Sequence, residues 1–180
     1  MDKRIAVVTG ASSGIGKSTV EKLLEDGFVV VGFARRADRL NEITGEHFHA
    51  VVGDVTNKSD VNNLVDEVKD RYGKIDVLVN NAGVGYLGRM DETRLEEWDK
   101  MIDINLKGLL SVTHAFLPML VENRAHLINV DSVAGHEVYP DGVVYCSTKH
   151  AVRVISIGLE KELKGKVKIT NVSLIELNAL

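Results

Sequence analysis

Short apolar runs alternate along the chain with longer stretches in which apolar residues recur at helical spacing. The runs that predict strands are residues 5–8, 28–31, 50–52, 77–79, 127–130 and 167–172. The first five are continuous rather than alternating, which is typical of parallel strands covered by helices on both faces. The sixth starts with alternating Val167 and Ile169, which favours a place nearer the edge of the sheet.

Three amphipathic stretches between these runs predict helices. The apolar face of the first is formed by Val61, Leu64, Val65, Val68 and Tyr72. These positions follow the i, i+3, i+4, i+7 rule for one face of a helix. Ser59 is the expected N-cap of this helix, and Gly73 is its expected stop. Two longer helices are expected at about 95–120 and 144–163, the latter beginning near Tyr145.

The alternation of strands and helices predicts a doubly wound, Rossmann-like α/β fold with a parallel sheet. A length of 180 residues without a Pro- or Ser-rich linker fits one domain over residues 1–180. A single cysteine, Cys146, excludes an internal disulfide and fits a reducing, cytoplasmic compartment.

Charge and hydropathy exclude several partners. The net charge is −4 with both signs dispersed, so we expect no nucleic-acid partner. No apolar run approaches the ~20 residues of a membrane span, and the start of the chain does not read as a signal peptide. His47 and His49 lie at strand spacing but lack further ligands nearby, so no metal site is expected.

A glycine-rich loop follows the first strand. Its candidate cofactor-binding residues are Gly10, Ser12, Ser13, Gly14, Ile15 and Gly16. Glycines between a first strand and a first helix let the backbone approach a pyrophosphate, which the helix N-terminus then binds. The end of the loop also resembles a P-loop of nucleotide hydrolases. That motif needs a glycine where Ala11 stands, so we keep it as a remote alternative.

The second strand ends in arginine rather than in an acid. An acid about 20 residues after the glycines binds the ribose of NAD, whereas arginine accommodates the 2′-phosphate of NADP. Arg35 is the preferred phosphate ligand, and Arg36 either stacks on adenine or is exposed. We therefore expect NADP(H) as the cofactor.

Tyr145 and Lys149 are four residues apart near the start of the last long helix, so they share a helix face. An ammonium beside a phenol lowers the phenol pKa and makes Tyr145 a usable proton donor or base. Ser132 follows the fifth apolar run, where its hydroxyl can bond the same carbonyl oxygen. Asp131, directly before it, points in a direction that the sequence leaves open.

The glycine loop, the Asn80 to Gly83 segment, Ser132 and the Tyr145/Lys149 pair together resemble the short-chain dehydrogenase/reductase family. The resemblance covers residues 3 to about 173. It implies a hydride transfer between NADP(H) and a ketone or secondary alcohol, with Tyr145 as the catalytic acid/base. A catalytically silent or impaired NADP-binding protein on the same fold remains the alternative.

The resemblance also implies roles for individual residues. Lys149 would lower the Tyr145 pKa and bond the nicotinamide ribose, and Ser132 would orient the substrate carbonyl. Asn105 would hold a water in a proton relay. The further cofactor contacts that it implies are Asp54, Val55, Asn81, Ala82 and Gly83.

The resemblance extends to assembly and to the end of the chain. It implies a homodimer or homotetramer that pairs through helices at about 95–120 and 145–163. Related chains continue past about residue 173 with a lid and a last strand that this sequence lacks. A truncated product, an incomplete sequence and a natural variant are all consistent with that difference. Without a further strand, the sixth strand would have an unpaired edge.

Overall fold

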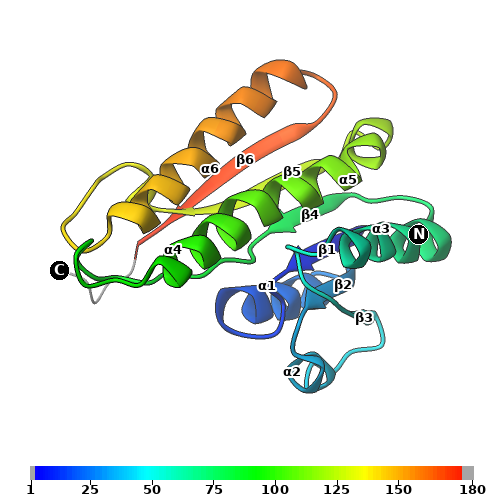
Figure 1. Ribbon diagram of the computed structural model, residues 1–180. Helices are drawn as coiled ribbons and strands as arrows, with labels where there is room; N and C mark the ends of the chain where they lie inside the picture. Colours follow the sequence, from blue (N-terminus) through cyan, green and yellow to red (C-terminus); the bar gives the residue numbers. More distant parts are fainter. Residues whose placement is uncertain (1–2, 176–180) are drawn as a thin grey trace.

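Six parallel strands form one sheet in the order β3-β2-β1-β4-β5-β6 in the computed structural model, which describes residues 3–175 (Figure 1). The strands are β1 (Ile5–Thr9), β2 (Val29–Ala34), β3 (Phe48–Val52), β4 (Val77–Asn80), β5 (His126–Ser132) and β6 (Lys168–Leu174). The order reverses beside β1, which pairs with both β2 and β4. This is the doubly wound fold that the sequence predicts, and its switch point places the loops after β1 and β4 side by side.

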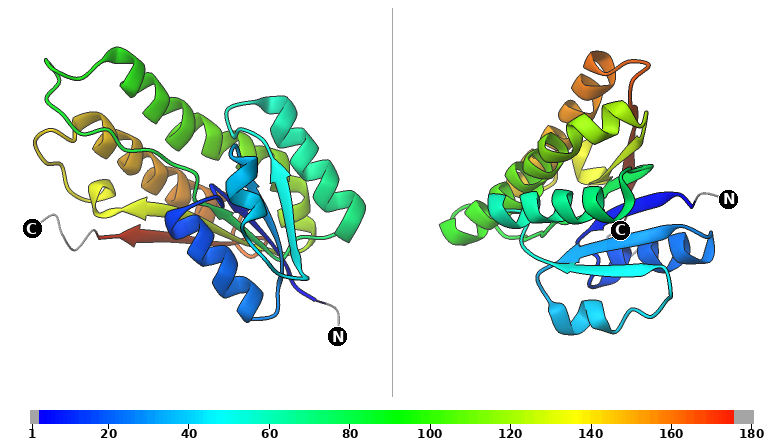
Figure 2. Two further views of the ribbon diagram at one scale, coloured as in Figure 1. Left: turned by 90° about the horizontal axis from the view of Figure 1, so that it is seen from below. Right: turned by 90° about the vertical axis from the view of Figure 1, so that its right-hand side faces the viewer.

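Helices lie on both faces of this sheet (Figure 2). They are α1 (Gly14–Glu25), α2 (Ala37–Asn41), α3 (Lys58–Tyr72), α4 (Leu95–Ile102), α5 (Leu109–Glu122) and α6 (Val143–Glu162), with a π-helical turn η1 (Asp103–Gly108) and a 3₁₀ turn η2 (Val133–Gly135). One core joins α3 and α5 to the sheet through Leu64, Phe116 and Leu78. The other core packs α1 and α2 against the opposite face through Val20 and Leu40.

The outer strands are less covered than the sequence pattern suggests. β6 is the edge strand, as predicted, although it runs from Lys168 to Leu174 rather than over 167–172. β3 forms the other edge and is only half-buried. Side chains of β5 alternate between buried and half-buried, so β3 and β5 are less completely covered than β1 and β2. The tail at 176–180 lies outside the described residues.

The predicted N-cap of α3 is also wrong by two residues. Asn57, not Ser59, caps the helix, because the Asn57 Oδ1 accepts hydrogen bonds from the backbone N–H groups of Ser59 and Asp60. The predicted stop is confirmed, since Gly73 has a φ of 66° in the left-handed region that ends helices. The Asn57 side-chain oxygen therefore caps the helix, a role that a serine hydroxyl can also fill.

The helix expected at about 95–120 consists of α4, η1 and α5 in one continuous stretch, Leu95–Glu122. By length and composition alone, this stretch would suffice to cross a membrane. One side of it packs in the core, where Val112, Phe116 and Leu120 are fully buried. The core helix of a globular α/β domain passes the same test, so the stretch is weak support for a membrane segment.

Candidate functional site

A cavity of about 470 Å³ opens between the loops that follow β1, β2, β3 and β4. Most of the candidate cofactor residues line it, namely Gly10, Ser12, Ser13, Ile15, Gly16, Arg35, Arg36, Asp54, Val55, Asn81, Ala82 and Gly83. Of the remaining candidates, Gly14, Tyr145 and Lys149 are not part of its lining. A volume of this size is within the range of small-molecule and cofactor pockets.

The glycine loop is held against the loop after β4 at very close range. Gly10 has a φ of 67°, and a Cβ there would lie 2.9 Å from both the Ala82 Cα and the Asn81 Nδ2. A Cβ on Gly16 would clash with the Gly10 carbonyl oxygen. The Asn81 Nδ2 donates to the Thr9 carbonyl at 3.0 Å. Only glycine fits at these two positions, which leaves the backbone of the loop bare toward the cavity.

The two arginines after β2 have different partners. Arg36 donates from its Nη2 to the Ser13 Oγ at 2.6 Å and to the Ser12 Oγ at 3.1 Å. Arg35 instead forms an ion pair with Asp54, with 3.6 Å between Nη1 and Oδ2. Both guanidinium groups therefore stand at the β2 end of the cavity, where the sequence places a phosphate ligand. Arg36 is hydrogen-bonded to the glycine loop, a contact that the sequence does not reveal.

Tyr145 and Lys149 lie on the first turns of α6, facing the carboxyl end of β5. The Lys149 Nζ donates to the Val130 carbonyl at 2.9 Å and lies 5.9 Å from the centre of the Tyr145 ring. Burial lowers the pKa of Lys149, while the negative charge of Asp131 acts in the opposite direction. The Tyr145 ring also packs at Gly85, where an added Cβ would lie 3.3 Å from its Cε2 atom. The pair thus stands beside the loop from β4 that borders the cavity.

Ser132 is the last residue of β5 rather than the residue after it. Its Oγ accepts a hydrogen bond from the Ala134 N–H at 3.2 Å and so caps the turn η2. Ser132 is half-buried, whereas the neighbouring Asp131 is buried on the other side of the strand. The candidate proton-transfer residues therefore come from two adjoining elements, β5 and α6, which contact each other in the fold.

Comparisons with known proteins agree with this arrangement. A family model described as short chain dehydrogenase matches residues 4–177. The chain belongs to the short chain dehydrogenase family. An uncharacterized oxidoreductase of Staphylococcus saprophyticus is 44% identical over 164 residues, which make up 88% of this chain and 67% of that protein.

Solved structures of short chain dehydrogenases and related enzymes share the fold. A serine dehydrogenase in its closed form, complexed with NADP⁺, is 34% identical with a TM-score of 0.91, and the match covers 95% of this chain and 71% of that chain. An alcohol dehydrogenase of the archaeon Thermococcus sibiricus, complexed with 5-hydroxy-NADP, is 31% identical with a TM-score of 0.93. That match covers 98% of this chain and 78% of the archaeal chain. The predicted family and fold are confirmed.

In this short chain dehydrogenase, Asn105 lies in the π-helical turn η1 and is buried. Its Oδ1 accepts from the Val84 N–H, and its Nδ2 donates to the Val84 carbonyl, both at 2.8 Å. The Nδ2 also donates to the Thr148 Oγ1 at 3.1 Å. Asn105 therefore joins the loop after β4 to the residue that precedes Lys149, and so connects the cavity with α6.

Several cavity-lining residues are absent from the sequence-based set. They are Phe33, Ala34, Gly53, Val84 and Ile104. Ala34, Gly53, Val84 and Ile104 each adjoin a predicted residue in the sequence, and Phe33 lies two residues before Arg35. The neighbours of the predicted residues are therefore the signal by which the sequence could have indicated them. Among residues 3–175, no group of three or more His, Cys, Asp and Glu side chains is placed to hold a metal ion.

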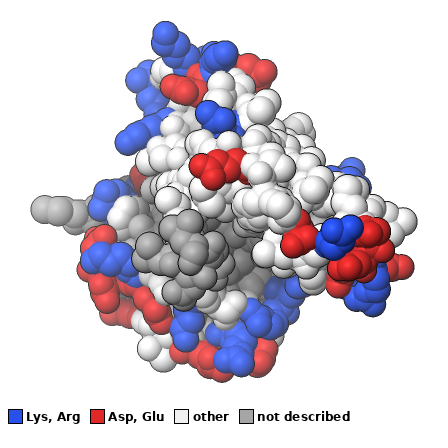
Figure 3. All heavy atoms as spheres, turned by 90° about the vertical axis from the view of Figure 1, so that its left-hand side faces the viewer, with Lys and Arg blue, Asp and Glu red and all other residues white. Residues whose placement is uncertain are grey.

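Figure 3 shows the molecule from the side at which β6 ends. Among the described residues, uncharged side chains occupy much of the upper and right-hand part of this face, and charged residues of both signs gather mainly around its edge. Among the described residues in this view, no single sign of charge dominates.

Proposed function

We propose that this chain is an NADP(H)-dependent oxidoreductase that interconverts a carbonyl compound and a secondary alcohol. The observation that carries the proposal is the placement of Tyr145, Lys149 and Ser132 at the carboxyl edge of the sheet, with Tyr145 packed on the loop that lines the cavity. In open α/β sheets, ligands bind outside the carboxyl ends of the strands. The substrate class stays general, because no described contact selects one compound.

The cavity fits a dinucleotide. Its glycines let a pyrophosphate approach the backbone at the N-terminus of α1, and its arginines lie where a 2′-phosphate would be bound. Gly10, Ser12, Ser13, Gly14, Ile15 and Gly16 would hold the pyrophosphate side, and Asp54, Val55, Asn81, Ala82 and Gly83 the adenosine side. The solved relatives complexed with NADP⁺ and 5-hydroxy-NADP support this cofactor.

When bound, NADP(H) donates or accepts the hydride. The chain itself would position the substrate and move the proton. Ser132 would hydrogen-bond the carbonyl oxygen, and the Tyr145 hydroxyl would give that oxygen its proton in reduction or take it in oxidation. Lys149, as a cation close to the phenol, would favour the phenolate and bond the ribose hydroxyls. Asn105 would hold a water that links Lys149 to solvent.

The proposal predicts that Tyr145→Phe loses activity while it keeps the cofactor. Removing the hydroxyl removes the proton donor, which is worth about 10²–10⁴-fold in kcat. NADPH binding, measured by fluorescence titration, should change little, because the ring still packs at Gly85. Turnover is measured by NADPH absorbance on a panel of ketones and aldehydes.

Tyr72→Phe is the matched control, since Tyr72 lies on α3 away from the cavity. Full activity in Tyr145→Phe would contradict the assignment of the acid/base. A wild-type protein that binds NADPH but turns over no carbonyl would support the catalytically silent alternative. Binding of ATP without binding of NADPH would favour the remote P-loop alternative.

We further propose a cytoplasmic homodimer or homotetramer that pairs through α4–α5 and α6. Both α4 and the turn η1 contact α6, and the two helical stretches run side by side (Figure 1). Their outer surfaces carry large apolar side chains that are exposed in the single chain, namely Leu95, Ile102, Leu110, Val154 and Ile157. Clustered exposed apolar residues mark surfaces that another chain covers.

A further inference from the structure

Asp131 is a fully buried carboxylate directly before Ser132, and the proposed reaction does not use it. Its side chain has 0% exposure. One oxygen, Oδ2, accepts a hydrogen bond from the Asn171 Nδ2 at 2.8 Å and a longer one from the Ser173 Oγ at 3.5 Å. The other oxygen, Oδ1, is buried and has no hydrogen-bond partner among the described residues. A buried carboxylate in this state needs a compensating positive charge.

The buried cation of this region is Lys149. Its Nζ donates to the carbonyl of Val130, the residue next to Asp131, and only 9% of Lys149 is exposed. Burial alone lowers the Lys149 pKa, and the charge of Asp131 raises it. Two opposite charges that are both removed from water interact more strongly than a pair at the surface does.

The carboxylate also supports the turn that follows Ser132. A Cβ on Gly135 would lie within 2.6 Å of both carboxylate oxygens, so the bare Gly135 backbone packs directly on the charged group. This turn, η2, is the one whose N–H group at Ala134 bonds the Ser132 Oγ. Asp131 thus contacts the turn that bonds Ser132, and it follows directly after Val130, whose carbonyl accepts the hydrogen bond from Lys149.

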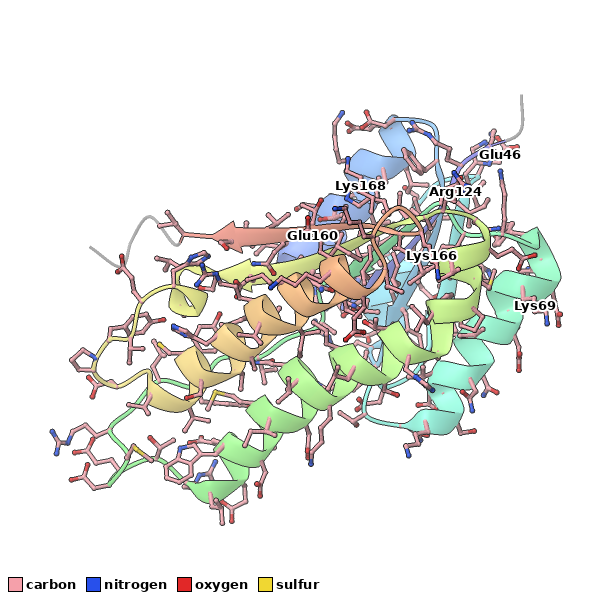
Figure 4. All side chains as sticks on the ribbon, turned by 90° about the horizontal axis from the view of Figure 1, so that it is seen from above. Glu46, Lys69, Arg124, Glu160, Lys166 and Lys168 are labelled. Carbon is pink, nitrogen blue, oxygen red and sulfur yellow. The ribbon has the colours of Figure 1, made fainter. Side chains whose placement is uncertain are left out.

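The other charged and titratable groups around Asp131 are few. His136, at the end of η2, lies 4.0 Å from Oδ2 and is 2.7 Å from the Ser173 Oγ, but its side chain is 42% exposed. From α6, the charged group on which Asp131 acts is Lys149. From β6, the facing groups are the uncharged Asn171 and Ser173. In Figure 4, Glu160, Lys166 and Lys168 lie toward the start of β6, at the opposite end of that strand.

We propose that Asp131 is a positioning residue that acts through Lys149: its buried negative charge keeps Lys149 protonated beside Tyr145 while its carboxylate holds the Ser132 turn. This inference rests on the proposed function for its catalytic meaning. The effect of the Asp131 charge on the Lys149 pKa does not depend on turnover. It can therefore be measured even if the protein reduces no substrate.

The test is a pH titration of the lysine side chains by NMR of their ¹³Cε signals in the full chain, with Lys149 assigned from a Lys149→Arg spectrum. Asp131→Asn keeps the size and one acceptor but removes the charge. Because Asp131 raises the Lys149 pKa, its removal should lower that pKa and change the ionisation equilibrium about tenfold. Asp131→Ser carries the same expectation with a smaller side chain, in case Asn at this place impairs folding.

Turnover gives a second readout if the wild type is active. In the variants, Lys149 would lose its proton as the pH rises through its lowered pKa. The loss in kcat should therefore be small at pH values below the lowered Lys149 pKa and should grow as the pH rises through it, to about tenfold. A purely structural defect would reduce kcat by the same factor at every pH, and that result would overturn the proposal.

Two controls separate the alternatives. His136→Gln removes the other group near the carboxylate, and Asp26→Asn removes an exposed carboxylate that pairs with Lys22 far from the site. Both should leave the Lys149 titration unchanged. An unchanged Lys149 titration in both Asp131 variants would refute the inference. An inactive wild type with a shifted Lys149 titration would refute the proposed function alone.

Discussion

At the scale of single residues, Arg35 and Arg36 show how neighbours in sequence acquire different surroundings. The offset of these arginines from the glycine loop predicts that one of them binds a 2′-phosphate at the end of β2. It does not predict which guanidinium turns toward the cavity, because that depends on serines 23 and 24 residues earlier in the chain. Arg36 bonds Ser12 and Ser13, whereas Arg35 pairs with Asp54.

We expect both arginines to contribute to the preference for NADPH. Arg35→Ala and Arg36→Ala should each weaken NADPH binding by about 10- to 100-fold, the value of charged hydrogen bonds to a phosphate. NADH binding should change much less, because NADH lacks the 2′-phosphate. Fluorescence titration with both cofactors measures the difference, and Arg39→Ala on α2, whose side chain pairs with Glu42, is the control. Equal weakening of both cofactors would contradict the assignment.

The direction of the Asp131 side chain could not be predicted from the sequence. The sequence places a carboxylate beside Ser132 but does not say on which side of the strand it points. The answer depends on the register of β6, which sets Ser173 opposite Asp131 and Asn171 two pairs earlier, opposite Asn129. Such cross-strand partners lie about 40 residues away in the chain.

At the scale of elements, periodicity located α3, the stretch from α4 to α5, and α6, yet it missed local details of their ends and interiors. The cap of α3 depends on which side-chain oxygen reaches two free N–H groups, and both Asn57 and Ser59 are suitable residue types. The π-helical turn η1 within the long helix has no periodic signature of its own. It nevertheless places Asn105 inward, against Val84 and Thr148.

The cap of α3 gives a simple stability test. Asn57→Ala should lower the free energy of unfolding by about 1 kcal/mol, because two N–H groups at the start of the helix lose their acceptor. Ser59→Ala should change it by less than about 0.5 kcal/mol, since Ser59 contributes its backbone rather than its side chain to the cap. Urea unfolding followed by circular dichroism measures both. The reverse order would restore Ser59 as the cap.

At the scale of the whole molecule, alternating strands and helices were sufficient to predict the sheet and its switch point. Short connections and right-handed crossovers leave few other arrangements for such a chain. How far helices bury the side chains of each strand could not be predicted in the same way. Continuous apolar runs predict two covered faces, but β3 and β5 also depend on their places in the sheet and on which helices reach them.

The proposed assembly belongs to this scale as well. Val154 is 68% exposed and Ile157 is 42% exposed on the outer surface of α6. Replacing both by Glu should convert the proposed dimer or tetramer into monomers in sedimentation velocity, because burying carboxylates at an apolar interface is costly. Val138→Glu, at a position that is 67% exposed in the turn before α6, is the control. A wild type that sediments as a monomer at micromolar concentration would disprove the assembly.

The central place of β1 has a consequence for how the protein is made. β1 pairs with β2 early, but its other neighbour, β4, follows about 70 residues later. At about 5–20 residues per second, a ribosome needs on the order of ten seconds to supply it. During that interval the nascent chain exposes the backbone edge of Ala6, Val7 and Val8 that later pairs with β4, and the glycine loop lacks Asn81 to hold it. This open edge is the point at which we expect the growing chain to pair with other chains if nothing covers it.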